Sequence, residues 1–209
     1  NMNEDGFIDI LAVVEEDYKI IWFQNDGLGN FNQQSMFSEG NRVENNSFQM
    51  IDLDGDEDLD IVYHTSSREV VWQENTGNLN FAAPEKIVKV ERSANIYFSD
   101  IDGDEDLDLV QSSRKLAWHS NDGQANFGEK QIIASDSLPV GYRSIIHDFD
   151  DDGDNDIING WGSLDTLSLY INNGQGDFSI KAISPIGMES VGRFSEADIN
   201  NDDYMDFVI

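Results

Sequence analysis

The residues in this chain that could do chemistry are aspartates at alternate positions. Residues 52–60 read DLDGDEDLD, which places carboxylates at the first, third, fifth, seventh and ninth positions. Two such charges about 4 Å apart repel by roughly 1 kcal/mol in water and by about 4 kcal/mol at an effective dielectric of 20. A hard divalent cation removes this repulsion, and Ca²⁺ suits the stretch better than Mg²⁺ because it accepts more oxygen ligands in flexible geometry. The alternative is a solvated acidic turn.

The acidic stretch recurs along the chain at intervals of about 50 residues. Its copies start near residues 1, 52, 100, 148 and 198. A regular repeat of this length indicates one supersecondary unit used several times. It also favours a cation site over an isolated acidic turn, because the same ligand pattern returns with the unit.

Each acidic stretch is followed by segments that predict strands. An apolar run comes directly after it, a second apolar run ending in an aromatic follows, and then comes an Asn-Gly turn that closes on Phe. We expect that Phe to start a third strand, and the alternating residues before the next acidic stretch to form a fourth. The first runs are residues 10–14, 61–63, 109–110, 157–158 and 207–209. The second runs are residues 20–22, 70–72, 116–118 and 167–170, and the turns are residues 25–31, 75–81, 121–127 and 172–178.

Four short antiparallel strands per unit, without helical periodicity, predict an all-β fold of β-propeller type. We expect about four to five four-stranded blades in one region spanning residues 1–209, with the acidic loops emerging on one face between the innermost and second strands. The repeat is incomplete at both ends, so we expect the chain to be part of a larger polypeptide that forms a seven-bladed ring.

The composition limits the partners of the chain. Among its 209 residues, 42 are acidic and 12 basic, the net charge is −30, and 39% are hydrophobic, which is enough for a core. No Lys/Arg cluster is present to release counterions, so we expect no nucleic-acid binding and no attraction to anionic membranes. No apolar run reaches 18 residues, so we expect no membrane insertion. The favoured partners are cations, basic surfaces and neutral sugars, and the absence of cysteine excludes disulfides and thiol catalysis.

The loop pattern DxDxDGxxD, complete at residues 148–156, together with the NDGxgNF turns, resembles the FG-GAP/VCBS repeats of secreted bacterial proteins and of integrin alpha chains. The resemblance covers essentially the whole chain. It implies a calcium-stabilised propeller displayed outside the cell, used for adhesion or for binding an extracellular carbohydrate or protein.

The resemblance also implies the metal ligands, which are side chains at the first, third, fifth and ninth positions and a backbone carbonyl at the seventh. The expected side-chain ligands are Asn1, Asn3, Asp5, Asp9, Asp52, Asp54, Asp56, Asp60, Asp100, Asp102, Asp104, Asp108, Asp148, Asp150, Asp152, Asp156, Asp198, Asn200, Asp202 and Asp206. The expected carbonyl ligands are those of Phe7, Asp58, Asp106, Asp154 and Tyr204. We therefore expect four to five Ca²⁺ ions.

The copies depart from the family pattern in two ways. The side-chain ligands carry formal charges of −2 in the first copy, −4 in each of the middle three and −3 in the last. Because affinity follows ligand charge and rigidity, we expect the middle sites to bind tightest and the first weakest. The family glycine at the sixth position is present as Gly6 and Gly153 but replaced by Glu57, Glu105 and Asp203, which leaves the turn geometry there open.

The arithmetic of calcium binding favours an extracellular or cell-surface location. A dissociation constant of about 0.1 mM is typical of extracellular modules. With calcium at about 1 mM, each such site stabilises the fold by roughly 1.4 kcal/mol. Cytosolic calcium would leave these sites empty, so we expect a secreted protein, of bacterial type by the resemblance.

The sequence contains no motif for catalysis. The patterns GxSxG, HExxH and GxxxxGK are absent, and His64, His119 and His147 fall at different points of the repeat. The main alternative to a binding module is the propeller portion of a secreted polysaccharide-degrading enzyme, such as a lyase, and a third is a structural spacer in a large surface protein. Trp161 and Asp165 lie in an insertion that breaks the repeat, and we predict that they contact the ligand because insertions map to one face, often the binding face.

Overall fold

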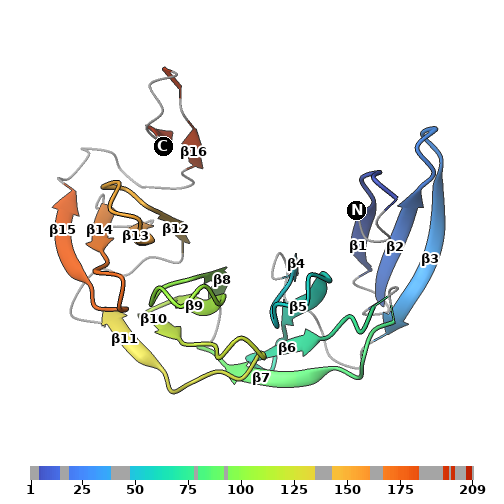
Figure 1. Cartoon of the computed structure of the whole chain (residues 1–209), viewed down its shortest axis with the longest axis horizontal. Coiled ribbons are helices and arrows are strands. Elements are labelled where there is room, and N and C mark those ends of the chain that lie inside the picture. The colour runs from blue at the N-terminus through green and yellow to red at the C-terminus, as the bar shows by residue number, and fades with distance from the viewer. Residues whose placement is uncertain are drawn as a thin grey trace. The chain divides into compact units, whose positions relative to one another are not determined.

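The structure of the chain is a computed structural model. The structure describes residues 5–14, 19–38, 48–77, 80–91, 94–134, 143–160, 167–183, 195–197, 199–200 and 206–208. These residues form strands, turns and bends, with no helix among them (Figure 1). No helix in this part of the chain is therefore long and apolar enough to cross a membrane.

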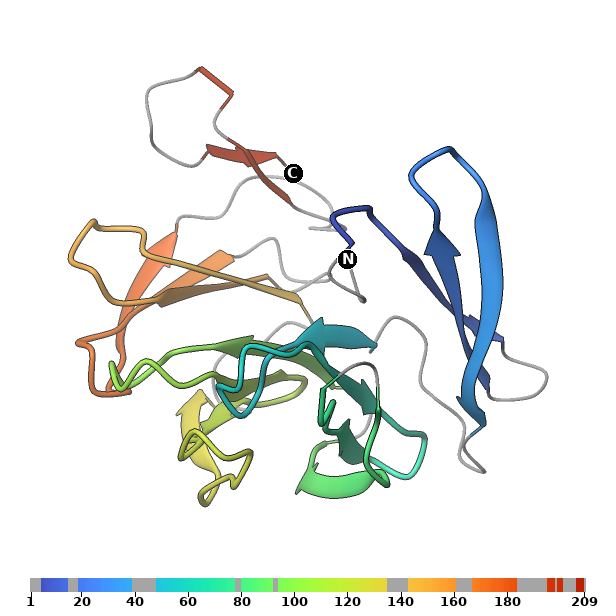
Figure 2. The same cartoon turned by 45° about the vertical axis from the view of Figure 1, so that its right-hand side comes forward.

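The strands form antiparallel sheets in which chain neighbours are also neighbours in space (Figures 1 and 2). Blade 1 contains β1 (Ile10–Val14), β2 (Lys19–Asn25) and β3 (Phe31–Ser38). Blade 2 contains β4 (Gln49–Ile51), β5 (Asp60–His64), β6 (Glu69–Gln73) and β7 (Glu85–Lys89). Blade 3 contains β8 (Asn95–Ser99), β9 (Asp108–Ser112), β10 (Leu116–His119) and β11 (Gln131–Ala134). Blade 4 contains β12 (Arg143–His147), β13 (Asp156–Gly160), β14 (Leu167–Ile171) and β15 (Ser179–Ile183).

A last pair consists of β16 (Ser195–Ala197) and β17 (Asp206–Val208). Together, these sheets confirm the predicted β-propeller architecture of four-stranded antiparallel blades. The chain divides into two compact units, residues 1–90 and 91–209. The number of blades in a closed ring, and one propeller region over residues 1–209, stay predictions.

The second strand of each complete blade is fully buried, and so is β10 in blade 3. β5, β9 and β13 are buried along their whole length, whereas β7 and β11, the outer strands of blades 2 and 3, are partly exposed. A sheet that packs on both faces requires apolar residues on both, and these strands supply them. Burial of this kind positions the acidic loops, because each loop leads directly into one of these strands.

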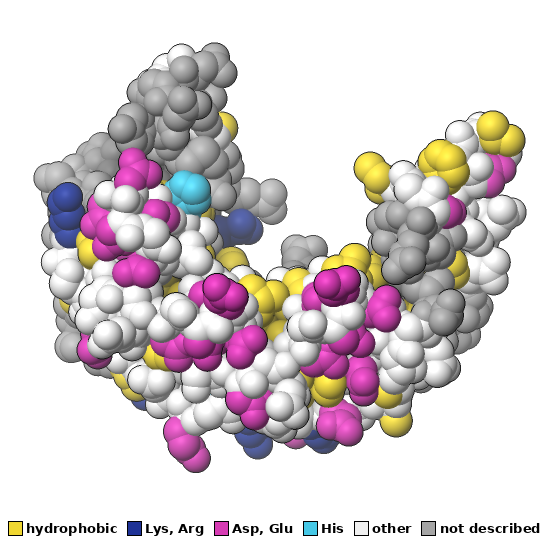
Figure 3. Space-filling view, in the orientation of Figure 1, with side chains coloured by type: hydrophobic (Ala, Val, Ile, Leu, Met, Phe, Trp, Pro, Cys, Tyr) yellow, Lys and Arg dark blue, Asp and Glu magenta, His cyan; other side chains and the backbone are white. Residues whose placement is uncertain are grey.

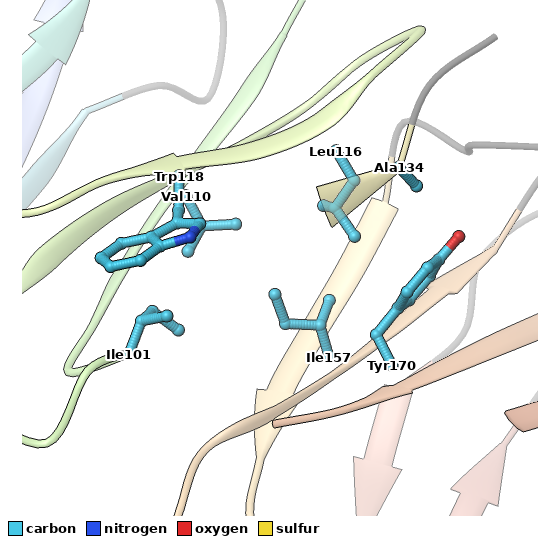
Figure 4. Packing of buried hydrophobic residues seen from close by; sticks show 7 residues of the cluster. All are labelled: Ile101, Val110, Leu116, Trp118, Ala134, Ile157 and Tyr170. Atoms are coloured by element: carbon cyan, nitrogen blue, oxygen red, sulfur yellow. The ribbon is translucent and has the colours of Figure 1, made fainter. Parts of the chain in front are cut away.

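Blades 3 and 4 share one core inside the second unit (Figure 4). Val110, Leu116 and Trp118 of blade 3 pack with Ile157 and Tyr170 of blade 4, and Ile101 of the acidic loop joins the same cluster. In the first unit, Ile20 of blade 1 packs in the same way against Ile61, Tyr63 and Val71 of blade 2. The recurring aromatic that ends the second apolar run is therefore a packing residue between blades in the case of Trp118.

The third strands differ from the prediction that Phe starts them. β3 does begin at Phe31, but β7 and β11 begin later, at Glu85 and Gln131. Phe81 and Phe127 instead make isolated bridges to Asn75 and Asn121 that close the turn. The pairing of the outer strand shows a register shift in blades 1, 2 and 3 alike, so this shift does not account for the later start of β7 and β11.

Candidate metal centres

The acidic loops connect the first and second strands of the blades, as predicted. Residues 52–60 join β4 to β5, residues 100–108 join β8 to β9, and residues 148–156 join β12 to β13. We call them loops 2, 3 and 4, and residues 5–9 are the described part of loop 1. Figure 3 shows acidic side chains gathered over loops 2, 3 and 4.

Three aspartates in each of loops 2, 3 and 4 lie close enough to share one metal ion. They occupy the first, third and ninth positions, and one carboxylate oxygen from each lies within 4.8 Å of the others. The groups are Asp52, Asp54 and Asp60; Asp100, Asp102 and Asp108; and Asp148, Asp150 and Asp156. Unscreened carboxylates this close repel each other, so the arrangement has the chemistry of a site for a hard cation.

The ninth aspartate is fully buried and fixes the loop to the rest of the blade. In loop 3, Asp108 accepts hydrogen bonds from the N–H of Ile101 (2.9 Å) and the N–H of Asn121 (2.8 Å). The ninth aspartates of loops 2 and 4 accept the matching pair of bonds, and Asp60 also accepts one from Trp72 Nε1 at 2.8 Å. The carboxylate is therefore a structural residue as well as a candidate ligand.

The first aspartate closes the loop turn. Asp52 accepts the N–H of Gly55 (2.8 Å) and of Glu57 (2.9 Å), and Asp100 accepts the N–H of Gly103 and of Glu105. These bonds orient the carboxylate before any ion is bound. The loop is thereby shaped by its own backbone N–H groups.

The fifth aspartate does not belong to the three-residue groups. Oδ1 of Asp56, Asp104 and Asp152 each accepts the N–H of the seventh residue at 2.9–3.0 Å. The sequence pattern predicts that this residue is a metal ligand, like the first, third and ninth. Its place in the ligand set stays a prediction, as do the seventh-position carbonyls of Asp58, Asp106 and Asp154.

The third aspartate provides the test of whether these loops fit a cation. Oδ1 of Asp54 and Oδ1 of Asp102 are buried without any hydrogen-bond partner. A buried carboxylate oxygen without a partner is costly unless something positive satisfies it. Both atoms belong to residues of the three-residue groups, so the donor set fits a metal ion.

The pKa values of the third and ninth aspartates of loops 2, 3 and 4 are raised, mainly because burial disfavours the charged form. Burial, followed by the charges of Asp60 and Asp56, raises the pKa of Asp54 to about 6. Burial raises the pKa of Asp108 to about 7, against the hydrogen bonds from Asn121 and Ile101, which lower it. A bound cation would act in the opposite direction, since it favours the ionised carboxylates.

The loops share one backbone turn although their glycines are placed differently. The fourth and sixth positions both have positive φ, as Gly55 (75°) and Glu57 (73°) in loop 2 and as Asp151 (58°) and Gly153 (96°) in loop 4. Loop 3 matches loop 2, with Glu105 at 73°. The missing sixth-position glycine therefore does not change the turn, because a glutamate adopts the left-handed conformation in its place.

A contact between the loop and the Asn-Gly turn could not be seen in the sequence. The side chain of the seventh loop residue lies over the turn glycine, as Asp106 over Gly123 and Asp154 over Gly174. A Cβ on Gly123 would lie 2.7 Å from the Asp106 carboxylate oxygens. In loop 1, Phe7 covers Gly27 in the same way. The recurring glycine thus serves close packing as well as its positive φ of 74° at Gly123.

Several predicted site residues lie outside the described part of the chain. These are Asn1, Asn3, Trp161, Asp165, Asp198, Asp202 and Tyr204. In loop 1, Asp5 accepts the N–H of Phe7 and Asp9 accepts the N–H of Asn25, as their counterparts do in the other loops. Asn200 is exposed in a bend and Asp206 starts β17.

Four-stranded blades that each carry an acidic loop after the first strand define a repeat protein of β-propeller type. The chain belongs to the FG-GAP-like repeat family, which matches residues 1–63, 52–111 and 148–209. No curated protein sequence matches the chain.

Solved structures share the fold. One is an Agrocybe aegerita lectin described for its specific recognition of non-reducing terminal N-acetylglucosamine, with a TM-score of 0.75 and 19% identity over 95% of this chain. Another is the Photorhabdus luminescens Tc holotoxin pore, with a TM-score of 0.52 and 19% identity over 91% of this chain. The chain spans 56% of the lectin and 10% of the toxin chain.

Proposed function

We propose that the chain is a calcium-binding propeller module that acts outside the cell by binding a carbohydrate or protein ligand, without catalysis of its own. The observation that carries the metal part is the partnerless, buried Oδ1 of Asp54 and of Asp102 inside a group of three aspartates. A site of this kind holds a cation to stabilise the loop, and the loop in turn holds the buried second strand of its blade.

Calcium is the ion that the donor set favours. All the predicted ligands are oxygens, and Ca²⁺ accepts six to eight of them in variable geometry, whereas Mg²⁺ requires a near-ideal octahedron. Loops 2, 3 and 4 would bind three ions, and the predicted ligands of the first and last copies would bind one or two more. Calcium at about 1 mM, as found outside cells, would fill sites with dissociation constants of about 0.1 mM.

The ligand class is argued from the fold and from the charge of the chain. The chain has the fold of a lectin that recognises N-acetylglucosamine, and its charge of −30 favours neutral sugars and basic protein surfaces over anionic partners. A propeller presents many loops on one face, which suits recognition of a sugar or a protein segment.

The test is a thermal melt with calcium, with magnesium and with neither, followed by metal counting on the purified protein. We expect a large rise in melting temperature with calcium, a smaller one with magnesium, and four to five ions per chain. An equal response to both ions, or no response, would mean that the loops are solvated acidic turns.

A glycan array probed with the calcium-loaded and calcium-free chain tests the ligand class. Calcium-dependent retention without release of sugar fragments supports a binding module. Breakdown of a bound polysaccharide would instead support the propeller portion of a secreted lyase or hydrolase.

A further inference from the structure

Every described Asn-Gly turn begins with an asparagine that clamps the acidic loop of its own blade. Its backbone N–H bonds Oδ1 of the ninth loop aspartate at 2.8 Å, and its Nδ2 bonds the eighth loop carbonyl at 3.1–3.3 Å. The four residues are Asn25, Asn75, Asn121 and Asn172. This clamp holds the ninth carboxylate beside the first and the third.

Asn172 also reaches the loop of the preceding blade. Its Nδ2 donates to the carbonyl of Ile101 at 2.8 Å, and both groups are buried. The N–H of Ile101 in turn donates to Asp108 at 2.9 Å, while the N–H of Asn172 donates to Asp156 at 2.8 Å. A continuous path of hydrogen bonds therefore runs from the ninth aspartate of loop 3 to the ninth aspartate of loop 4.

A second link joins the same two loops. Asn155, which precedes Asp156, donates from Nδ2 to the carbonyl of Asp100 at 3.2 Å. Gly103 of loop 3 also lies against the turn of blade 4, since a Cβ there would be 3.1 Å from the carbonyl oxygen of Gly174. Loop 4 and its turn thus contact the backbone of loop 3 at its first, second and fourth residues.

We propose that Asn172 is a positioning residue that couples cation binding at loops 3 and 4, so that filling one loop raises the affinity of the other. This rests on the calcium binding proposed above. An ion in loop 3 orders the Asp100 and Ile101 carbonyls that accept from Asn155 and Asn172. The ordering cost that loop 4 must meet when it binds its own ion is thereby lowered, which is positive coupling without a change of fold.

The experiment measures that coupling directly by calcium titration of the ¹⁵N-labelled full chain. The amide signals of Gly103 and Gly153 report the two loops separately, because each N–H bonds the first aspartate of its own loop. Asp150→Asn disables loop 4 through its third ligand, and the affinity of loop 3 is then read at Gly103. Asp102→Asn and the Gly153 signal give the reverse measurement.

We expect Asp150→Asn to weaken calcium binding at loop 3 about five-fold or more, and Asp102→Asn to weaken binding at loop 4 by the same factor, as linkage requires. In an Asn172→Ala background both factors should fall toward one. Asn155→Ala, which removes only the second link, should lower them in part. Asn25→Ala removes the matching local clamp of loop 1 and should leave both factors unchanged.

Two results would overturn the proposal in distinguishable ways. If Gly103 and Gly153 both respond to calcium but Asp150→Asn leaves the loop 3 affinity unchanged, the loops bind calcium independently and the coupling is wrong while calcium binding stands. If neither signal responds to calcium, the calcium function itself fails, and the coupling fails with it.

Discussion

The third and ninth aspartates of a loop share an ion site but differ in what else they hold. Oδ1 of Asp102 has no hydrogen-bond partner, whereas Asp108 is fully buried and accepts two backbone N–H groups from separate segments. This oxygen at the third position is thus available to a cation. The ninth position is needed by the fold whether or not a cation is bound.

This difference predicts opposite results for two similar substitutions. Asp102→Asn should stabilise the calcium-free chain or leave it unchanged, because burial and the charges of Asp104 and Asp100 raise the pKa of Asp102 and so disfavour its ionised form. It should remove about 1.4 kcal/mol of calcium-dependent stabilisation. Asp108→Asn should destabilise the chain with and without calcium, because an amide NH₂ would face the N–H of Ile101 or of Asn121. Urea unfolding of each variant with and without 1 mM calcium measures both effects, and equal behaviour of the two variants would contradict the assignment.

The positive φ of Glu57 predicts a stabilising substitution. A non-glycine residue in the left-handed region destabilises the folded chain by about 1–2 kcal/mol. Replacing it with glycine removes this strain, but the greater conformational entropy of glycine in the unfolded chain offsets part of the gain. Glu57→Gly should therefore raise the unfolding free energy by about 0.5–1 kcal/mol. Glu57→Gln is the control for the lost charge. Gly55→Ala, where a Cβ meets nothing within 4 Å, should lower it by about 1 kcal/mol through φ alone.

The raised pKa values of Asp54 and Asp108 predict that pH acts in opposite directions with and without calcium. Their folded values, about 6 and about 7, exceed the ordinary value of 3.8, so protonation favours the folded calcium-free chain. The contribution of these two groups to the stability of the calcium-free chain should be fully present below pH 4, and it should be lost as the pH rises through 6 to 7. Calcium requires the ionised groups, so its stabilising effect should grow over the same range. Melts of dialysed protein at pH 5 and pH 8, with and without calcium, measure this, and a calcium effect larger at pH 5 would contradict it.

At the scale of the elements, the apolar runs that follow each acidic stretch were sufficient to locate the strands. The runs at residues 10–14 and 61–63 became β1 and β5, because a strand that is buried on both faces, as β5 is, needs a continuous apolar run. The start of β7 was not predictable, since Phe81 pairs with Asn75 in the turn before regular pairing begins. Contacts between loop and turn were also invisible, because they join residues that are distant in sequence.

The turn of blade 4 packs against blade 3, so adding one methyl group at this contact should strongly reduce stability. Gly176 and Gly29 occupy the same turn position, with φ of 73° and 89°, but a Cβ on Gly176 would lie 2.1 Å from Cζ2 of Trp118. Trp118 is 2% exposed and cannot move away without disturbing the shared core. Gly176→Ala should therefore destabilise the chain by about 1–3 kcal/mol more than Gly29→Ala. Chemical denaturation of both variants in calcium measures the difference, and equal costs would mean that the turn does not bear on Trp118.

At the scale of the whole molecule, the question is how the chain tolerates a net charge of −30. Repulsion between repeats acts over distances that salt screens, whereas repulsion inside a loop acts within 4.8 Å. The Debye length falls from about 30 Å at 0.01 M salt to about 10 Å at 0.1 M, which is still longer than the spacing inside a loop. Salt and calcium therefore relieve different parts of the same repulsion.

This separation predicts that sodium chloride cannot replace calcium. Raising it from 0.01 to 0.1 M should stabilise the calcium-free chain modestly, by screening one repeat from another. Calcium at 1 mM should then add a further increment at 0.1 M salt, up to about 7 kcal/mol if five sites with dissociation constants of about 0.1 mM contribute independently. Unfolding by urea under the four conditions measures both increments. If salt alone stabilised the chain as much as calcium does, the loops would be responding to screening and not to a bound ion.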